Sequence, residues 1–236
     1  MTAAWLCVLQ LGPAAPLGQT RGKMQARSVG QESVAVSGQL SLDGFAAADP
    51  QPYSLFFALM PDAAAAGRAA EVAAQVARDQ GVSVKTERTA RFHVTLFHVG
   101  HFAGDVPAGT LAIARSVAAG VSAPCLDVSF THVGSFTGRP GNLPIVLLGG
   151  NAEPALMGFQ ASLQDRLLRA GLTAGVLHKT FNPHLTLFYG RQPLEERAIT
   201  PIHWRADSFV LLRSVIGQGR YIEEGRWPLQ ASTTSS

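Results

Sequence analysis

Apolar positions along residues 53–229 form short runs and helical stripes in mixed order, which predicts a chain of both strands and helices. Strands are predicted at residues 53–60, 92–99, 126–133, 144–148, 184–189, 209–216 and 219–223. Helices are predicted from 61 to 80, from 107 to 119 and from 154 to 170, and a glycine follows the first and the third. The last two strands are close enough in sequence to form a hairpin.

The first 49 residues differ from the rest, because they are rich in Gly, Gln, Ser, Ala and Pro and show no sustained period. Their mildly apolar start, Ala4 to Leu11, lacks a preceding basic residue and is a poor match to a signal peptide. We therefore expect residues 1–49 to be a flexible tail, or an over-extended start with Met24 as a later initiator. Residues 231–236 are also expected to be loose, which leaves 50–230 as the folded domain.

Composition narrows the class of protein. The hydrophobic fraction of 47% is enough for a core, and no apolar run reaches the roughly 18 residues that span a bilayer, so we expect a soluble protein that does not bind membranes. Cys7 and Cys125 form no CxxC motif or Cys/His cluster, which argues against a zinc site or a disulfide and favours a reducing, cytoplasmic location.

The net charge of +3 is too small to indicate binding of long nucleic acids by itself. Of the 19 basic residues 16 are Arg, which suits phosphate binding but also fits a GC-rich genome.

One unit of strand, helix and His-x-Thr strand occurs twice. Asp62, at the start of the first helix, precedes His93 by 31 residues, and Glu153, at the start of the third helix, precedes His184 by 31 residues. A repeat that also duplicates a chemical motif is not expected by chance. It predicts two similar lobes related by a pseudo-twofold axis.

The repeated motif carries the candidate chemistry. Alternate side chains of a strand share a face, so His93 lies beside Thr95 and His184 lies beside Thr186, with apolar neighbours pointing the other way. A neutral and a protonated imidazole can act as the base and the acid that phosphodiester cleavage needs, while the threonine hydroxyls donate to the phosphoryl oxygens. Two histidines can also bind a metal, but the carboxylates or third histidine of a catalytic metal site are not evident. The pattern therefore predicts a phosphoesterase that works without a metal or another cofactor.

Other polar and aromatic residues are weaker candidates. His98 falls on the face opposite His93 if the strand stays regular, and the remaining histidines, His101, His132, His178 and His203, have no partner motif. Arg139, in a Gly/Pro loop with Ser135 and Thr137, can contact phosphate, although turn formation alone explains the glycines. Phe136 and Tyr221 can stack on a nucleobase or pack in the core.

The paired HxTL segments resemble those of the 2H phosphoesterase superfamily, and within it the bacterial 2′-5′ RNA ligase or RNA 2′,3′-cyclic phosphodiesterase family. Further matches are Leu55–Leu59 with Pro61, the Gly138–Asn142 loop, and the C-terminal stretch from Gly219 to Leu229. The resemblance covers about residues 52–229. One departure is Phe92, where Trp or Leu is frequent. The other is the stretch Phe188–Arg191, because many relatives place a basic residue nearer the second threonine.

The resemblance implies an α+β fold of two pseudo-symmetric lobes, with antiparallel sheets lining a central cleft and helices outside. It implies ATP- and metal-independent hydrolysis of RNA 2′,3′-cyclic phosphate ends to 2′-phosphates, with His93 as proton donor and His184 as acceptor. Thr95 and Thr186 would hold the phosphoryl oxygens, and a 5′-hydroxyl in place of water would give 2′-5′ ligation. The expected partners are RNA ends or short oligonucleotides, and the expected state is a monomer. Two alternatives stay open: another substrate, such as a cyclic nucleotide or 2′-5′ oligonucleotide, and a module that binds RNA ends or nucleotides without turnover.

Overall fold

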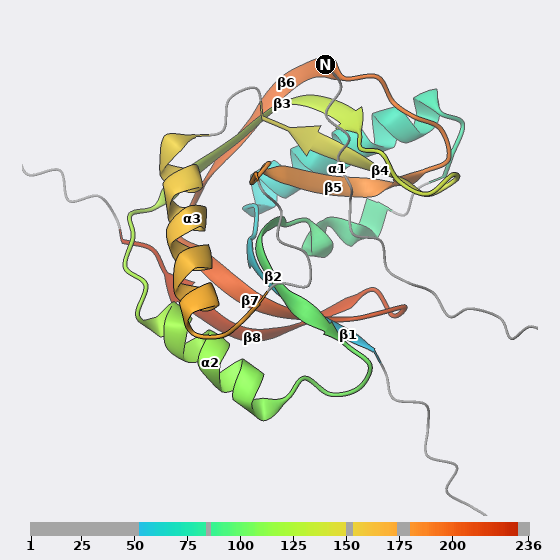
Figure 1. The fold of residues 1–236 in the computed structure, drawn as a ribbon. Coiled ribbons are helices and arrows are strands. Elements are labelled where there is room, and N and C mark those ends of the chain that lie inside the picture. The colour runs from blue at the N-terminus through green and yellow to red at the C-terminus, as the bar shows by residue number, and fades with distance from the viewer. Residues whose placement is uncertain (1–51, 84–85, 150–152, 174–179, 231–236) are drawn as a thin grey trace, which may run out of the picture. The chain divides into compact units, whose positions relative to one another are not determined.

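The structure is a computed structural model that describes residues 52–83, 86–149, 153–173 and 180–230. The predicted tails, residues 1–49 and 231–236, as well as His178, lie outside the described residues. The elements are β1 (Tyr53–Leu59), α1 (Ala63–Asp79), the 3-10 helix η1 (Thr86–Arg91), β2 (Val94–Phe102), α2 (Ala108–Ala119), β3 (Leu126–Ser135), β4 (Leu143–Leu148), α3 (Pro154–Arg169), β5 (His184–Gly190), β6 (Arg197–Ala206), β7 (Ser208–Val215) and β8 (Arg220–Pro228) (Figure 1). Every helix and strand predicted from the sequence is present, with ends shifted by a few residues.

All strands belong to one antiparallel sheet of eight, in the order β6-β3-β4-β5-β2-β1-β7-β8. The prediction of an α+β fold with antiparallel strands is confirmed, but the two expected sheets are joined into one. The join is narrow, because β2 and β5 pair only at Val94 and Leu185. The two His-x-Thr strands, β2 and β5, are therefore neighbours at the centre of the sheet. On the outer side of β2 lies β1, which precedes α1, and on the outer side of β5 lies β4, which precedes α3.

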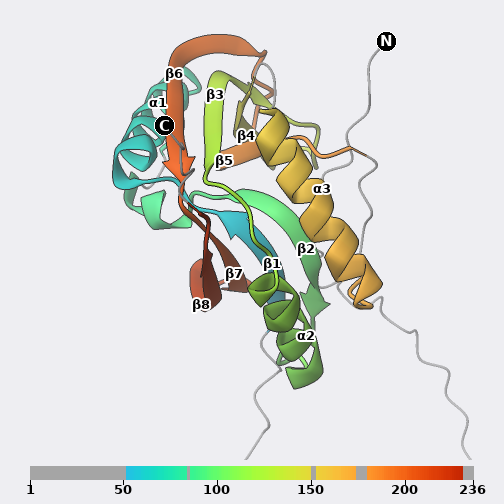
Figure 2. The ribbon, with the colours of Figure 1, turned by 90° about the vertical axis from the view of Figure 1, so that its left-hand side faces the viewer.

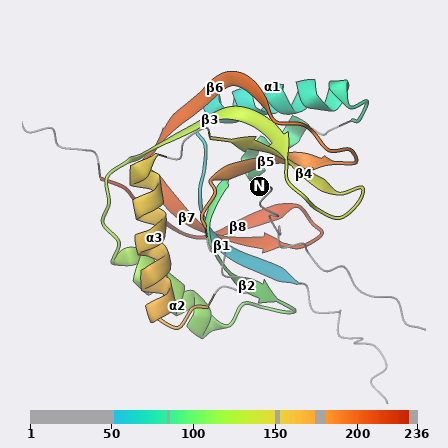
Figure 3. The ribbon, with the colours of Figure 1, turned by 45° about the horizontal axis from the view of Figure 1, so that its top comes forward.

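Each helix between the repeated strands packs on at least one strand from the opposite side of the join. Helix α1 follows β1 but contacts β5 and β6, and α3 follows β4 but contacts β2 and β3 (Figure 2). Helix α1 starts where the Asp62 carboxylate accepts a hydrogen bond from the Ala65 amide at 2.7 Å, and Gly81, with φ of 64°, follows its end. Helix α2 lies beside α3 and against β8 (Figure 3). Among the described residues, no helix is long and apolar enough to cross a membrane.

The core lies on the face of the sheet that these helices cover. Leu55, Phe57 and Leu59 of β1 belong to it, together with apolar side chains of β2 to β7, α1 and α3. The opposite face of the β1–β7 region carries a second, smaller apolar cluster of Phe56, Ala58, Val210 and Leu212. Alternation along β1 thus divides the sheet into a core face and a second face, which we call the site face.

Strand β6 and helix η1 were not predicted from the sequence. Strand β6 contains Pro201, which removes a backbone donor and is tolerated because β6 is an edge strand with an irregular register beside that residue. Its alternation is visible only at its end, where Ile202, Trp204 and Ala206 are buried. Long-range pairing with β3 therefore forms a strand that local pattern does not indicate.

Candidate active site

The two His-x-Thr segments meet where the halves of the sheet join. In the antiparallel register that pairs Val94 with Leu185, the neighbouring positions set His93 opposite Thr186 and Thr95 opposite His184. Val94 and Leu185 are fully or almost fully buried on the core face, so both histidines and both threonines are on the site face. The sequence-predicted quartet is thus assembled from segments that are far apart in the chain.

Both histidines are held in the same way. Nδ1 of His93 is 2.8 Å from the carbonyl oxygen of Arg91, and Nδ1 of His184 is 2.9 Å from the carbonyl oxygen of Asn182. In a neutral ring, Nδ1 donates to that carbonyl and Nε2 keeps its lone pair. Each ring is therefore oriented by the backbone two residues upstream, and Nε2 is the nitrogen that can take part in proton transfer.

His93 is enclosed by aromatic side chains. The ring of Phe56 lies 4.9 Å from the His93 ring, and the Tyr221 ring lies 5.5 Å away in an edge-on arrangement. The pKa of His93 is lowered to about 4, and burial is the main cause. The hydrogen bond to the Arg91 carbonyl opposes this decrease, whereas repulsion from a protonated His184 and from the Arg91 guanidinium adds to it. His93 is therefore neutral at pH 7 in the free protein, and it must gain a proton before it can act as an acid.

This environment makes a direct prediction about titration. The Cε1 proton shift of His93, followed by NMR, should move with a midpoint near pH 4. Because the folded-state pKa lies below the unfolded value of about 6.5, the unfolded chain takes up the proton first, so the free energy of unfolding should decrease as the pH falls from about 6.5. A His93→Gln variant, which cannot titrate there, should show a smaller decrease. A wild-type midpoint near 6.5 would contradict the description of His93 as desolvated.

The His184 side of the site contains one of the predicted aromatic residues. The half-buried Phe136 ring lies 4.9 Å from the His184 ring, edge-on, as Tyr221 lies against His93. Burial raises the pKa of the Tyr221 hydroxyl, while the Arg91 guanidinium, 5.2 Å from the ring centre, opposes this rise. Arg139 is exposed in a turn in which its carbonyl accepts a hydrogen bond from the Asn142 amide, and its role at the site stays a prediction.

A β-bulge follows the threonine in both motifs. In β2 the register passes from Thr95 opposite Ala58 to Phe97 opposite Phe57, which leaves Leu96 as the extra residue. In β5 it passes from Thr186 opposite Val146 to Phe188 opposite Ile145, which leaves Leu187 as the extra residue. Gln160 of α3, itself buried, donates to the Leu96 carbonyl at 3.1 Å and so satisfies a backbone group of the first bulge.

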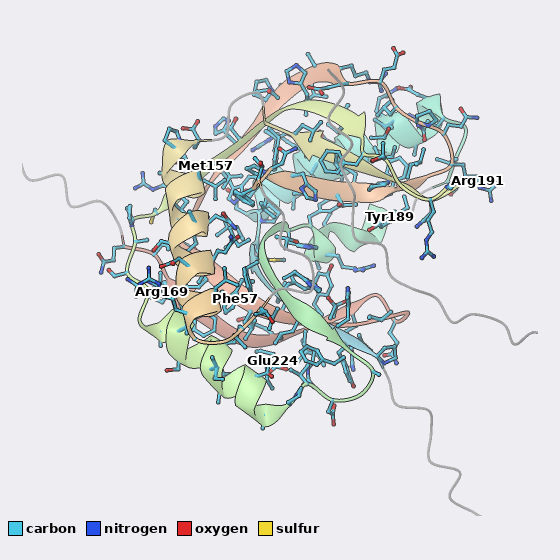
Figure 4. The ribbon with its side chains drawn as sticks, viewed as in Figure 1. Phe57, Met157, Arg169, Tyr189, Arg191 and Glu224 are labelled. Atoms are coloured by element: carbon cyan, nitrogen blue, oxygen red, sulfur yellow. The ribbon has the colours of Figure 1, made fainter. Side chains whose placement is uncertain are left out.

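These bulges correct the prediction for His98. The extra residue restores His98 to the face that carries His93 and Thr95, and a second irregularity at Val99 keeps His101 there too, opposite Ser54. The sequence contained a signal for this, because the adjacent apolar residues Leu96 and Phe97 break the alternation. On β5 the same shift brings the exposed Tyr189 onto the site face, at the end of the strand beside Arg191 (Figure 4).

Metal binding was the alternative use of the two histidines. Within the described parts of the chain, no group of three or more His, Cys, Asp or Glu side chains could hold a metal ion. The histidine pair is instead accompanied by hydroxyl donors and aromatic rings, and the ring nitrogens nearest the backbone are hydrogen-bonded to carbonyl groups. An antiparallel α+β fold that brings two such His/Thr pairs together fits the proton transfers that phosphodiester cleavage needs.

The chain belongs to the 2′-5′ RNA ligase superfamily, whose family model matches residues 61–217. The fold is similar to crystal structures of E. coli LigT in apo form, at 22% identity and a TM-score of 0.59, and of TT0787 from Thermus thermophilus, at 18% identity and 0.59. It is also similar to LigT complexed with 3′-AMP, at 19% identity and 0.53. Each match covers 76% of this chain and 99% of the other. A comparison with curated proteins finds no match.

Proposed function

We propose that the protein is a metal- and ATP-independent RNA 2′,3′-cyclic phosphodiesterase that leaves a 2′-phosphate end. The single observation that supports this most strongly is the pairing of β2 with β5 at Val94 and Leu185, which sets two His/Thr pairs side by side. Membership of the 2′-5′ RNA ligase superfamily supports an activity at RNA phosphodiesters. The LigT complexes with phosphate and with 3′-AMP support a ligand of the same chemistry here.

In the proposed reaction, Nε2 of His184 accepts a proton from the water that attacks phosphorus. The bond between phosphorus and the 3′ oxygen breaks, and His93 donates a proton from Nε2 to that oxygen. Thr95 and Thr186 donate to the non-bridging oxygens as charge develops on them. Because burial above all keeps His93 neutral in the free protein, the anionic phosphate has a further role: its negative charge raises the pKa of His93 and allows the ring to be protonated.

The same geometry accommodates ligation. If a 5′-hydroxyl takes the place of water, the bond that forms joins the 2′ and 5′ positions, and the two histidines keep their roles. Phe136 and Tyr221, which flank the two histidines, are proposed to border the nucleoside, and Arg139 is proposed as a more distant contact to the strand. The two-cysteine sequence without a disulfide pattern supports a cytoplasmic location, and we propose a monomer acting on RNA ends.

One assay tests the proposed function. Wild-type protein should hydrolyse adenosine 2′,3′-cyclic phosphate to adenosine 2′-phosphate at the same rate with and without excess EDTA, as followed by chromatography of both products. Loss of activity in EDTA that Zn²⁺ or Mn²⁺ restores would favour a metal site instead. Binding of the nucleotide without turnover would favour the alternative of a binding module, and turnover only of a 3′,5′-cyclic nucleotide would favour the alternative substrate.

A further inference from the structure

A row of histidines extends from the site along β2. Because of the two irregularities in the strand, Thr95, His98 and His101 lie opposite Ala58, Phe56 and Ser54, which are alternate residues of β1. Their side chains are therefore on the same face of the sheet as His93. Alternate residues of an antiparallel strand are roughly 7 Å apart, so the backbone positions of the row are about that far from one another. This spacing is comparable with that between neighbouring phosphates of a single RNA strand.

His98 and His101 are in contact with one another. Their ring centres are 4.4 Å apart, and Nε2 of His98 is 3.0 Å from the hydroxyl oxygen of Ser54. Ser54 is buried, whereas His101 is exposed, so the pair has an ordered inner end and an outer end that a ligand can reach. Glu223, which shares this face of β8, is paired with Arg226 at 2.6 Å. Its carboxylate is thus partly neutralised.

The chemistry of the pair favours an anion. Each imidazole has at least one N–H donor, and two adjacent rings that repel one another when both are charged are stabilised by an anion that contacts both of them. A metal ion is the other ligand of paired histidines, but among the described residues no third ligand completes such a site. Phosphate is the anion that a strand entering the neighbouring active site would bring to this position.

We propose that His98 and His101 bind the 5′-phosphate of the terminal nucleotide, the group that links it to the preceding residue of an RNA strand. The inference rests on the proposed function, because it assumes that the cyclic phosphate lies at His93 and His184. It makes the substrate a strand end rather than a free nucleoside cyclic phosphate. The contact is made by residues of this chain that the His-x-Thr motif does not include.

Two small substrates that differ by one phosphate test the proposal. For wild-type protein, kcat/KM for 5′-phosphoadenosine 2′,3′-cyclic phosphate should exceed that for adenosine 2′,3′-cyclic phosphate by about tenfold, as expected for one charge-assisted contact. In a His98→Gln/His101→Gln double variant the ratio of the two kcat/KM values should fall towards one. The ratio is insensitive to loss of folded protein, since both substrates are measured on the same sample. His203→Gln, at an exposed position of β6, is the matched control and should keep the wild-type ratio.

The possible results separate this inference from the function on which it rests. If wild type hydrolyses both substrates equally well, or if the double variant keeps the wild-type ratio, the inference is wrong and the proposed function stands. If wild type hydrolyses neither, the proposed function is wrong. In that case the contact of His98 and His101 with a 5′-phosphate is tested by binding, by comparing the Kd of adenosine 2′,5′-bisphosphate with the Kd of adenosine 2′-phosphate. Tighter binding of the bisphosphate by about tenfold, lost in the double variant, supports the contact, and equal values overturn it.

Discussion

Replacing His93 or His184 with alanine should lower kcat for adenosine 2′,3′-cyclic phosphate by a factor of about 10² to 10⁴, since each substitution removes one of the two proposed proton-transfer groups. His93 lies immediately before β2 and His184 is the first residue of β5, and each ring is oriented by a backbone carbonyl, so neither can take over the role of the other. Steady-state kinetics of the purified variants measures the effect, with circular dichroism as the check on folding. His203→Ala, on the edge strand β6, should retain wild-type activity.

Two further outcomes make this prediction specific to a pair of groups acting on one phosphate. The His93→Ala/His184→Ala double variant should lose scarcely more activity than the less active of the two single variants, because removing either histidine already disables the concerted proton transfers. The pH dependence of kcat/KM in wild type should be bell-shaped, and its two limbs belong to the coupled pair. A single variant that keeps more than about a tenth of the wild-type kcat would exclude that histidine as a general acid or base.

Thr95→Val and Thr186→Val should each lower kcat by about 10²-fold, the cost of losing one donor to an oxygen that gains charge in the transition state. Valine has nearly the same shape and favours strands, so the free energy of unfolding should change little. The loss should be larger in kcat than in affinity for a substrate analogue. Serine at the same positions keeps the hydroxyl and should restore part of the activity.

A matched control is available for the threonine series. Thr200 is exposed on β6, and Thr200→Val should leave kcat unchanged. If Thr95→Val or Thr186→Val raised KM alone, the hydroxyl would act in binding the ground state rather than in stabilising the transition state. If both variants kept full activity, the phosphoryl oxygens would have to be held by other groups.

The repeated motif made the centre of the site predictable from sequence. His93, Thr95, His184 and Thr186 stand out because a strand of period two must put each His/Thr pair on one face, and because the spacing to the preceding helix is duplicated. Phe136 and Tyr221 were also identified as candidates, and the structure places each against one of the histidines. Local pattern suffices for such features since they depend on backbone geometry within a single strand or on residue type alone.

Other features depend on contacts between distant segments. Strand β6 forms because β3 offers it a partner, in spite of Pro201. The single β2–β5 pair joins two expected sheets into one, and no sequence pattern specifies how many residues such a contact includes. The low pKa of His93 likewise results from packing among Phe56, Tyr221 and neighbouring charges.

The face on which His98 lies shows most clearly the difference between what the sequence pattern predicts and what the tertiary contacts decide. By alternation alone His98 lies opposite His93, but Leu96 is accommodated as a bulge against β1, with its carbonyl satisfied by Gln160 of α3. One extra residue reverses the face of every side chain beyond it, because the period of a strand is two. The sequence by itself therefore identified the candidate reacting groups and predicted the class of chemistry. Only the tertiary structure decided which further side chains stand beside them, since a bulge depends on the strand and the helix that pack against it.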